Sequence, residues 1–109
     1  MLVGALPKTA AGRVIGNQLV RSGTSVGANY RAACRARSKA EFIAKIGTVA
    51  EESDESAFWM ELIMEAGLLK LETVTPLHQE VEELTAIFTA SGRTAKTHNL
   101  KSTIRNQKC

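Results

Sequence analysis

The stretch from Gln18 to Met60 places apolar residues at helical spacing on both sides of a short break near Arg37. Apolar residues three and four positions apart share one face of an α-helix. The pattern therefore predicts two helices that fold back on one another. Four polar residues, spaced by four, three and four positions, form a stripe beside or within the apolar face of the first helix: Gln18, Ser22, Ser25 and Asn29.

The first helix is expected to run from Arg13 to the break near Arg37. Pro7 indicates a turn or a first helical position before it. Its predicted buried face consists of Val14, Ile15, Leu19, Val26, Tyr30 and Ala33. Three glycines within this stretch each cost roughly 1 kcal/mol relative to alanine. The alternative that residues 21–25 form a loop therefore stays open.

The second helix is expected to begin at Lys39, because Ser38 and Glu41 form a capping box. In this motif the Ser38 hydroxyl accepts from the Glu41 N–H, and the Glu41 carboxylate accepts from the Ser38 N–H. The helix is expected to continue to about Lys70. Its predicted apolar stripe is Phe42, Ile46, Val49, Ser53, Ser56, Met60 and Ile63.

A third helix is expected to open at Thr75 and Pro76, with threonine as the N-cap and proline at the first position. Ser91 and Gly92 are expected to close it with a glycine C-cap. Its predicted inner face is Leu77, Val81, Leu84, Ile87 and Phe88. Residues 1–92 are thus predicted to form the helical domain. Residues 93–109 are interpreted as a basic tail, either a frayed helical extension or a disordered arm.

A chain of 109 residues has room for one small domain. Only five residues are aromatic, so the core must be filled by aliphatic side chains and alanine, which favours helices. The predicted fold is an all-α antiparallel up-and-down helical bundle. No apolar run reaches the roughly 20 residues that span a bilayer, and the first six residues do not resemble a signal peptide. We expect a cytoplasmic protein with no membrane partner. Cys34 and Cys109 imply no disulfide framework.

Carboxylates flank the seam between the first two helices. Glu52 and Glu55 lie on either side of the apolar stripe of the second helix. Carboxylates near a buried seam need hydrogen-bond donors, because an unpaired buried charge is costly. We interpret these groups as a structural network that fixes helix register. Its predicted members are Gln18, Arg21, Ser22, Ser25, Asn29, Glu52 and Glu55.

Charge is distributed unevenly along the chain. Residues 1–45 hold eight basic residues and one acidic residue, residues 46–92 hold one basic and ten acidic, and residues 93–109 hold five basic and none acidic. This asymmetry suggests a basic surface for a polyanion, or self-association between opposite faces. The simpler alternative is that the acidic middle helix neutralises the charge of its basic neighbour. The candidate RNA- or DNA-binding residues are Arg31, Arg35, Arg37, Lys39, Arg93, Lys96, Lys101 and Arg105.

The sequence gives little support for an enzyme. A di-metal bundle site needs Glu-x-x-His motifs, and neither His78 nor His98 stands three residues after a glutamate. Gly23 and Gly27 are not followed by the Lys-Ser/Thr pair of a phosphate-binding loop. We expect no enzyme activity, no metal, no cofactor and no small-molecule substrate. The two remaining hypotheses are a non-catalytic nucleic-acid-binding bundle and a protein–protein assembly module.

Three segments together resemble the bacterial four helix bundle protein family, also called the ribosomal RNA intervening-sequence protein family. They are residues 18–29, with Gln-Leu-x-Arg-Ser-Gly-Thr-Ser-x-Gly-Ala-Asn, residues 38–45, with Ser-Lys-x-Glu-Phe-Ile-x-Lys, and residues 52–59, with Glu-x-x-Glu-Ser-x-x-Trp. The chain is also similar to the accessory protein of diversity-generating retroelements. The resemblance implies an antiparallel bundle, a homo-oligomer such as a pentameric ring, no enzymatic activity, and nucleic-acid binding in at least one branch.

The chain departs from this family at its start. The family places an amphipathic helix of about twenty residues before the position of Leu6 and Pro7, where this chain has only Met1 to Ala5. Three explanations stay open: a three-helix bundle, a gap filled by the tail or by a partner chain, or a misplaced start. A three-helix remnant would expose an apolar groove, and such patches mark interfaces or aggregation.

Overall fold

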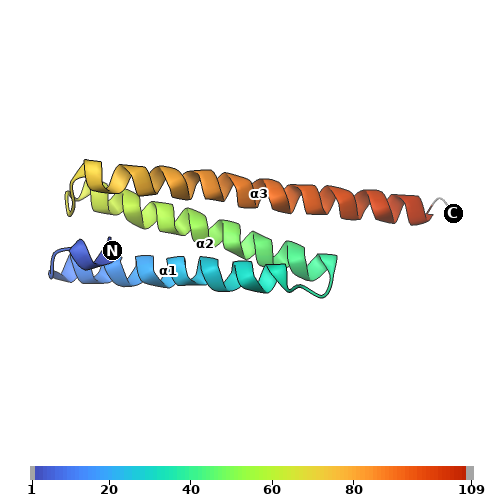
Figure 1. The fold of residues 1–109 in the computed structure, drawn as a ribbon, viewed down its shortest axis with the longest axis horizontal. Coiled ribbons are helices and arrows are strands. Elements are labelled where there is room, and N and C mark those ends of the chain that lie inside the picture. The colour runs from blue at the N-terminus through green and yellow to red at the C-terminus, as the bar shows by residue number, and fades with distance from the viewer. Residues whose placement is uncertain (1, 108–109) are drawn as a thin grey trace.

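The computed structural model describes the path of the chain from Leu2 to Gln107 and the side chains as far as His98. A short 3₁₀ turn, η1 (Val3–Ala5), precedes three helices: α1 (Ala10–Cys34), α2 (Lys39–Glu65) and α3 (Leu71–Gln107). Residues 2–107 contain no strand. The all-α prediction is therefore confirmed, with three long helices (Figure 1).

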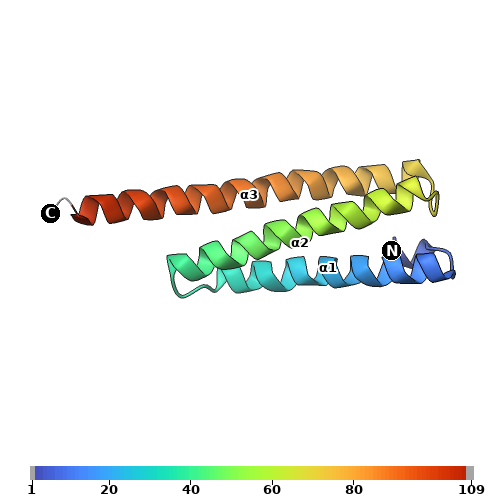
Figure 2. The same ribbon diagram turned by 180° about the vertical axis from the view of Figure 1, so that it is seen from behind.

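The three helices run antiparallel, with α2 between α1 and α3 (Figures 1 and 2). Both outer helices pack on α2. The molecule is a rod with extents of 63 × 21 × 17 Å. Its length reflects α3, which continues past the turn between α1 and α2 (Figure 1). The end of the rod that carries this turn is called the turn end below.

The core consists of two clusters along α2. One joins Leu6 and Leu19 to Met60, Ile63 and Val74. The other, nearer the turn end, is formed by Ala33, Ile46 and Val49. Six of the seven residues predicted for the stripe of α2 are buried, and Phe42 is half-buried. Because a fully buried valine or isoleucine contributes roughly 1.5–3 kcal/mol, this stripe is the main source of packing energy.

The structure corrects the start of α1. The helix begins at Ala10 rather than at Arg13, and Thr9 is its N-cap. The Thr9 hydroxyl accepts from the Gly12 N–H at 3.1 Å, so it satisfies one of the free donors of the first turn. The helix continues without interruption through residues 21–25, which rules out the loop alternative.

Two residues predicted for the buried face of α1 are exposed. Val14 is 59% exposed and Tyr30 is 48% exposed. α1 packs against α2 but has no third helix on its other side, so a wide apolar face cannot be covered in full. Leu19 and Ala33 are buried as expected.

The cap at the start of α2 is confirmed for Ser38. Its hydroxyl accepts from the Glu41 N–H at 3.0 Å. The second half of the predicted capping box differs, because the Glu41 carboxylate accepts from the N–H of Arg37 at 3.3 Å, not from that of Ser38. Both bonds satisfy backbone donors at the turn.

The second helix ends at Glu65, earlier than the predicted Lys70. The Leu68 N–H donates to the Ile63 carbonyl at 3.0 Å, and the Gly67 N–H donates to the Met64 carbonyl at 3.1 Å. These two bonds form a Schellman motif, in which the residue after the C-cap takes a left-handed conformation. Gly67 has a φ of 65°, which glycine adopts without a steric penalty.

The predicted start of the third helix is wrong. α3 begins at Leu71, so Thr75 is not its N-cap and Pro76 lies inside the helix. Proline inside a helix removes one backbone hydrogen bond. The earlier start buries Val74 completely against the first core cluster. We attribute the tolerance of Pro76 to this packing.

Gly92 does not end α3, which continues to Gln107. A Cβ atom at Gly92 would lie 3.4 Å from Ile46 Cγ2, which is ordinary van der Waals contact, so the glycine lies inside the helix beside α2 and does not cap it. Residues 93–107 continue α3 as a helical extension. Three residues of the predicted inner face are exposed: Leu77 by 39%, Leu84 by 44% and Ile87 by 57%.

Candidate nucleic-acid interface

Four of the predicted nucleic-acid-binding residues lie around the turn between α1 and α2. Arg31 is in the last turn of α1. Arg35 and Arg37 are in the connection, and Lys39 is the first residue of α2. Helices in an antiparallel hairpin bring these residues to one end of the molecule. All four are exposed.

Two further candidates come from α3. Arg93 and Lys96 lie beside the first part of α2, where they border a small hollow with Ile43 and Gly47. This part of α3 passes the turn end, as both views of the ribbon show (Figures 1 and 2). The side chains of the last two candidates, Lys101 and Arg105, lie outside the described residues. Segments that are far apart in sequence thus place their cations at the same end of the rod.

The described cations at this end have no acidic side-chain partner. Among residues 2–98, ion pairs involve only Arg21 and His78 as the cationic side. The one nearby acid, Glu41, accepts from a backbone N–H. We call the exposed cations around the turn and on the adjoining part of α3 the basic end: Arg31, Arg35, Arg37, Lys39, Arg93 and Lys96. Unpaired cations that are already solvated can contact phosphates without first breaking an ion pair.

The structural network predicted for the seam centres on Arg21. Its guanidinium contacts Glu52 Oε2 at 3.3 Å and pairs with Glu55. It also donates through Nε to Gln18 Oε1 at 3.0 Å. The Arg21 side chain is 47% exposed, so this network lies on the surface of the α1–α2 seam and not inside it.

These contacts shift two pKa values. The hydrogen bond from Arg21 lowers the pKa of Glu55, and a bond from the Trp59 indole adds to the effect. The same pair raises the pKa of Arg21 above its ordinary value. Charged hydrogen bonds favour the ionised form of each partner. The network therefore holds Arg21 and Glu55 in their ionised forms and ties α1 to α2.

The other predicted polar residues divide into two groups. Ser22 enters the buried interface, where its hydroxyl lies 2.8 Å from that of Ser56. Ser25 and Asn29 do not reach α2, because the Asn29 amide donates to the Ser25 carbonyl and hydroxyl of its own helix at 2.9 and 3.1 Å. A further contact between helices joins Ser53 of α2 to Thr85 of α3 at 2.7 Å. Our sequence reasoning missed this pair; the only available signal was a serine inside an apolar stripe.

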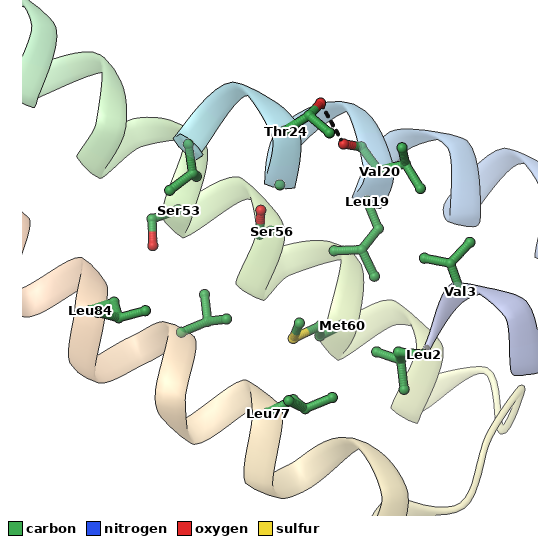
Figure 3. A pocket seen from close by; sticks show the side chains of 13 residues that line it. Leu2, Val3, Leu19, Val20, Thr24, Ser53, Ser56, Met60, Leu77 and Leu84 are labelled. Carbon is green, nitrogen blue, oxygen red and sulfur yellow. Dashed lines mark hydrogen bonds between the residues drawn. The ribbon is translucent and has the colours of Figure 1, made fainter. Parts of the chain in front are cut away.

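An apolar groove of about 350 Å³ runs between α1 and α3 with α2 as its floor (Figure 3). Leu19 and Val20 border it on the α1 side, Met60 lies on the floor, and Leu77 and Leu84 border it on the α3 side. Two of the three exposed residues of the α3 inner face, Leu77 and Leu84, therefore belong to this groove, whereas Ile87 lines a separate hollow with Phe42. It contains few polar groups, which makes it unsuitable for phosphate and suitable for another apolar surface.

The acidic residues show no arrangement suited to a metal ion. Within the described part of the chain, no group of three His, Cys, Asp or Glu residues could hold one. His78 instead connects two helices: its Nε2 lies 3.1 Å from Glu61 Oε2, and its Nδ1 lies 2.9 Å from Glu82 Oε1. No helix in the described residues has the length and apolar character that crossing a bilayer requires.

Comparison with known proteins identifies one family. Residues 2–90 match the model of the 23S rRNA-intervening sequence protein. A solved structure from Bacteroides thetaiotaomicron is also similar, with a TM-score of 0.70 and 31% sequence identity over 73% of this chain and 71% of that chain. It is described as a protein with unknown function from the S23 ribosomal protein family. No curated protein matches the chain.

Proposed function

This chain belongs to the 23S rRNA-intervening sequence protein family, and we propose that it is a non-catalytic helical bundle that binds RNA or DNA through the basic end. The observation that supports this most directly is the convergence of cations from the α1–α2 turn and from α3. These cations are exposed and have no acidic partner in the described part of the chain. Each phosphate that they contact would release counterions, so affinity would be salt-dependent and independent of sequence.

A non-catalytic role agrees with the way the polar groups are used. Arg21, Glu52 and Glu55 bond to one another across the α1–α2 seam, and Ser22 bonds to Ser56. These are contacts that position helices. The large groove is apolar and offers a substrate few groups that could move a proton or a charge.

The test of nucleic-acid binding is fluorescence anisotropy with labelled RNA over a series of salt concentrations. We expect binding that weakens steeply as salt increases, with a slope of roughly −0.7 to −0.9 per phosphate contacted in a plot of log K against log salt. The double variant Arg31→Glu/Arg35→Glu should reduce both the affinity and the slope. Lys8→Glu/Arg13→Glu is the matched control, because it changes the charge equally and both residues are exposed near the other end of α1. Equal loss in the control would argue against a specific basic end.

The second candidate is a protein–protein assembly module, and the apolar groove is the observation that favours it. Gly23 lines the groove, and no heavy atom lies within 4 Å of the position that its Cβ would occupy. We propose that the chain assembles into a homo-oligomer through such an apolar surface. Light scattering should then give a mass above that of one chain at low and at high salt, and five copies would match a pentameric ring. Gly23→Leu should reduce this mass, since its side chain would occupy the groove. A single-chain mass at all concentrations would contradict assembly.

A further inference from the structure

We propose that the basic end selects double-stranded nucleic acid, and contacts its phosphates, in preference to single strands. The inference rests on the proposed nucleic-acid function and specifies its substrate class. It follows from the exposed cations of the basic end and from its lack of a series of exposed aromatic side chains. Duplex RNA and duplex DNA share the chemistry in question, which is a fixed array of phosphates on two paired strands.

The described part of the basic end offers no series of exposed aromatic rings, and its one exposed aromatic side chain, Tyr30, already contacts Phe88. Proteins that bind single strands stack successive bases on aromatic side chains. Tyr30 is the nearest candidate, but one side of its ring meets Phe88, with ring centroids 5.8 Å apart and an interplanar angle of 47°. Phe42 is half-buried against the second core cluster. Phe58 and Trp59 contact each other in the acidic part of α2. Recognition at this end is therefore left to the cations.

The hollows at this end are also poorly suited to a single strand. The one beside Arg93 and Lys96 has a volume of about 180 Å³ and is lined otherwise by apolar residues, glycines and one threonine. The shallow hollow beyond Phe42 is lined by Ile87, alanines, Ser91 and Thr94. Single-strand binders hold the flexible backbone in a positively charged groove. Here the second hollow contains no cation, and the first contains only Arg93 and Lys96.

The positions of the cations suit a rigid ligand. Arg31 and Arg35 are four residues apart at the end of α1, and Arg93 and Lys96 are three residues apart on α3. Residues with these separations lie roughly 5–6 Å apart on a helix surface. The packing of both helices on α2 fixes the two pairs relative to each other. A duplex already holds its phosphates in place, whereas a single strand must be ordered to match them.

The charge density of the nucleic acid also favours a duplex over a single strand. A duplex carries about one negative charge per 1.7 Å of its axis, and counterion release per contact is larger for a duplex than for a single strand. A duplex would present the phosphates of two strands to the six described cations at this end. A single strand that crossed the same surface would meet only some of them.

The experiment uses the full chain and four ligands of one sequence: an RNA duplex, its two separate strands, and the corresponding DNA duplex. Anisotropy is measured for each over a salt series. We expect the Kd for the RNA duplex to be about tenfold lower than that for either strand, beyond the roughly twofold effect of doubling the phosphates. Similar affinity for the DNA duplex would support phosphate recognition. A preference for the RNA duplex over the DNA duplex would also support the inference and would indicate contacts to the 2′-hydroxyl groups.

Two variants test whether duplex binding depends on both pairs of cations and not on Tyr30. Arg93→Glu/Lys96→Glu should reduce duplex affinity as strongly as Arg31→Glu/Arg35→Glu, because a duplex needs both pairs. Tyr30→Leu should leave duplex affinity unchanged, and circular dichroism confirms that each variant is folded. Single strands that bind as tightly as the duplex would overturn the inference and leave the proposed function intact. Absence of binding to all four ligands would overturn both.

Discussion

The hydroxyl groups of Ser22 in α1 and Ser56 in α2 lie 2.8 Å apart within the buried interface of the two helices. Ser22 is fully buried and Ser56 is 5% exposed. Each hydroxyl oxygen also lies near a carbonyl of its own helix: Ser22 Oγ is 3.3 Å from the Leu19 carbonyl and Ser56 Oγ is 3.0 Å from the Glu52 carbonyl. Because each hydroxyl has one proton, one serine donates to the other while the second donates to its own carbonyl. The pair therefore connects the two helices at a point where small side chains allow them to approach closely.

This pair gives the first prediction. Ser22→Ala or Ser56→Ala alone should lower the free energy of unfolding by about 1–2 kcal/mol, because the remaining hydroxyl loses a partner in a buried site. The double variant should lose less than the sum of the two, since no unpaired group remains. Urea denaturation of all four proteins measures the coupling. Strict additivity would show that the two hydroxyls do not interact. Thr24→Ala serves as a control, because the exposed Thr24 hydroxyl bonds only within its own helix.

Two glycines of α1 should respond in opposite directions to alanine. At Gly23 an added Cβ has open space, so Gly23→Ala should stabilise the chain by about 1 kcal/mol through helix propensity. At Gly12 the same atom would overlap the carbonyl of Pro7, so Gly12→Ala should destabilise it by forcing residues 3–7 away from α1. Thermal denaturation measures both. A stabilised Gly12→Ala protein would contradict the close approach of Pro7 to α1.

Position 67 should tolerate few substitutions of its glycine. Its φ of 65° lies in the left-handed region, which costs an ordinary L-residue roughly 1–2 kcal/mol. Gly67→Ala should therefore lower the free energy of unfolding by about 1 kcal/mol, whereas Gly67→Asn should cost less, because asparagine tolerates this conformation. Equal stability of the alanine variant and the native protein in urea denaturation would mean that the turn does not need this conformation.

The Arg21–Glu55 pair predicts a dependence of stability on pH. Because the pair lowers the pKa of Glu55 in the folded state from its ordinary 4.5, the unfolded chain binds a proton more readily at this residue. The contribution of the pair is therefore complete above about pH 4.5 and is lost as the pH falls through the lower folded-state value. Arg21→Gln should lower the Tm at pH 7. At pH 3 the difference in Tm between this variant and the native protein should be smaller.

The effect on Tm should be small, since Arg21 and Glu55 are 47% and 36% exposed and solvent screens their attraction. Added salt should reduce it further. Arg13→Gln is the control, because Arg13 has no ion pair among the described residues. A constant difference between the native protein and Arg21→Gln from pH 7 to pH 3 would show that the pair makes no ionic contribution.

Local sequence features predicted the existence of the three helices and the residues on which the central helix packs. The stripe from Ile46 to Ile63 has a helical period strong enough to identify the central helix, and Ser38 provides a cap that depends only on neighbouring atoms. The polar stripe of the first helix indicated contacts to the second helix, which Ser22 and Arg21 make, whereas Gln18 bonds to Arg21 of its own helix. The candidate cations were identified from charge alone.

Tertiary packing decided the features that local signals predicted wrongly. Pro76 and Gly92 ordinarily mark helix boundaries, yet α3 passes through both, and burial of Val74 in the first core cluster favours the earlier start. The pairing of Ser53 with Thr85, and the position of Arg93 and Lys96 beside the α1–α2 turn, depend on how α3 lies along α2. Periodicity and capping arise from residues a few positions apart and can be derived from the sequence. The meeting of residues dozens of positions apart depends on helix packing, which only the folded molecule decides.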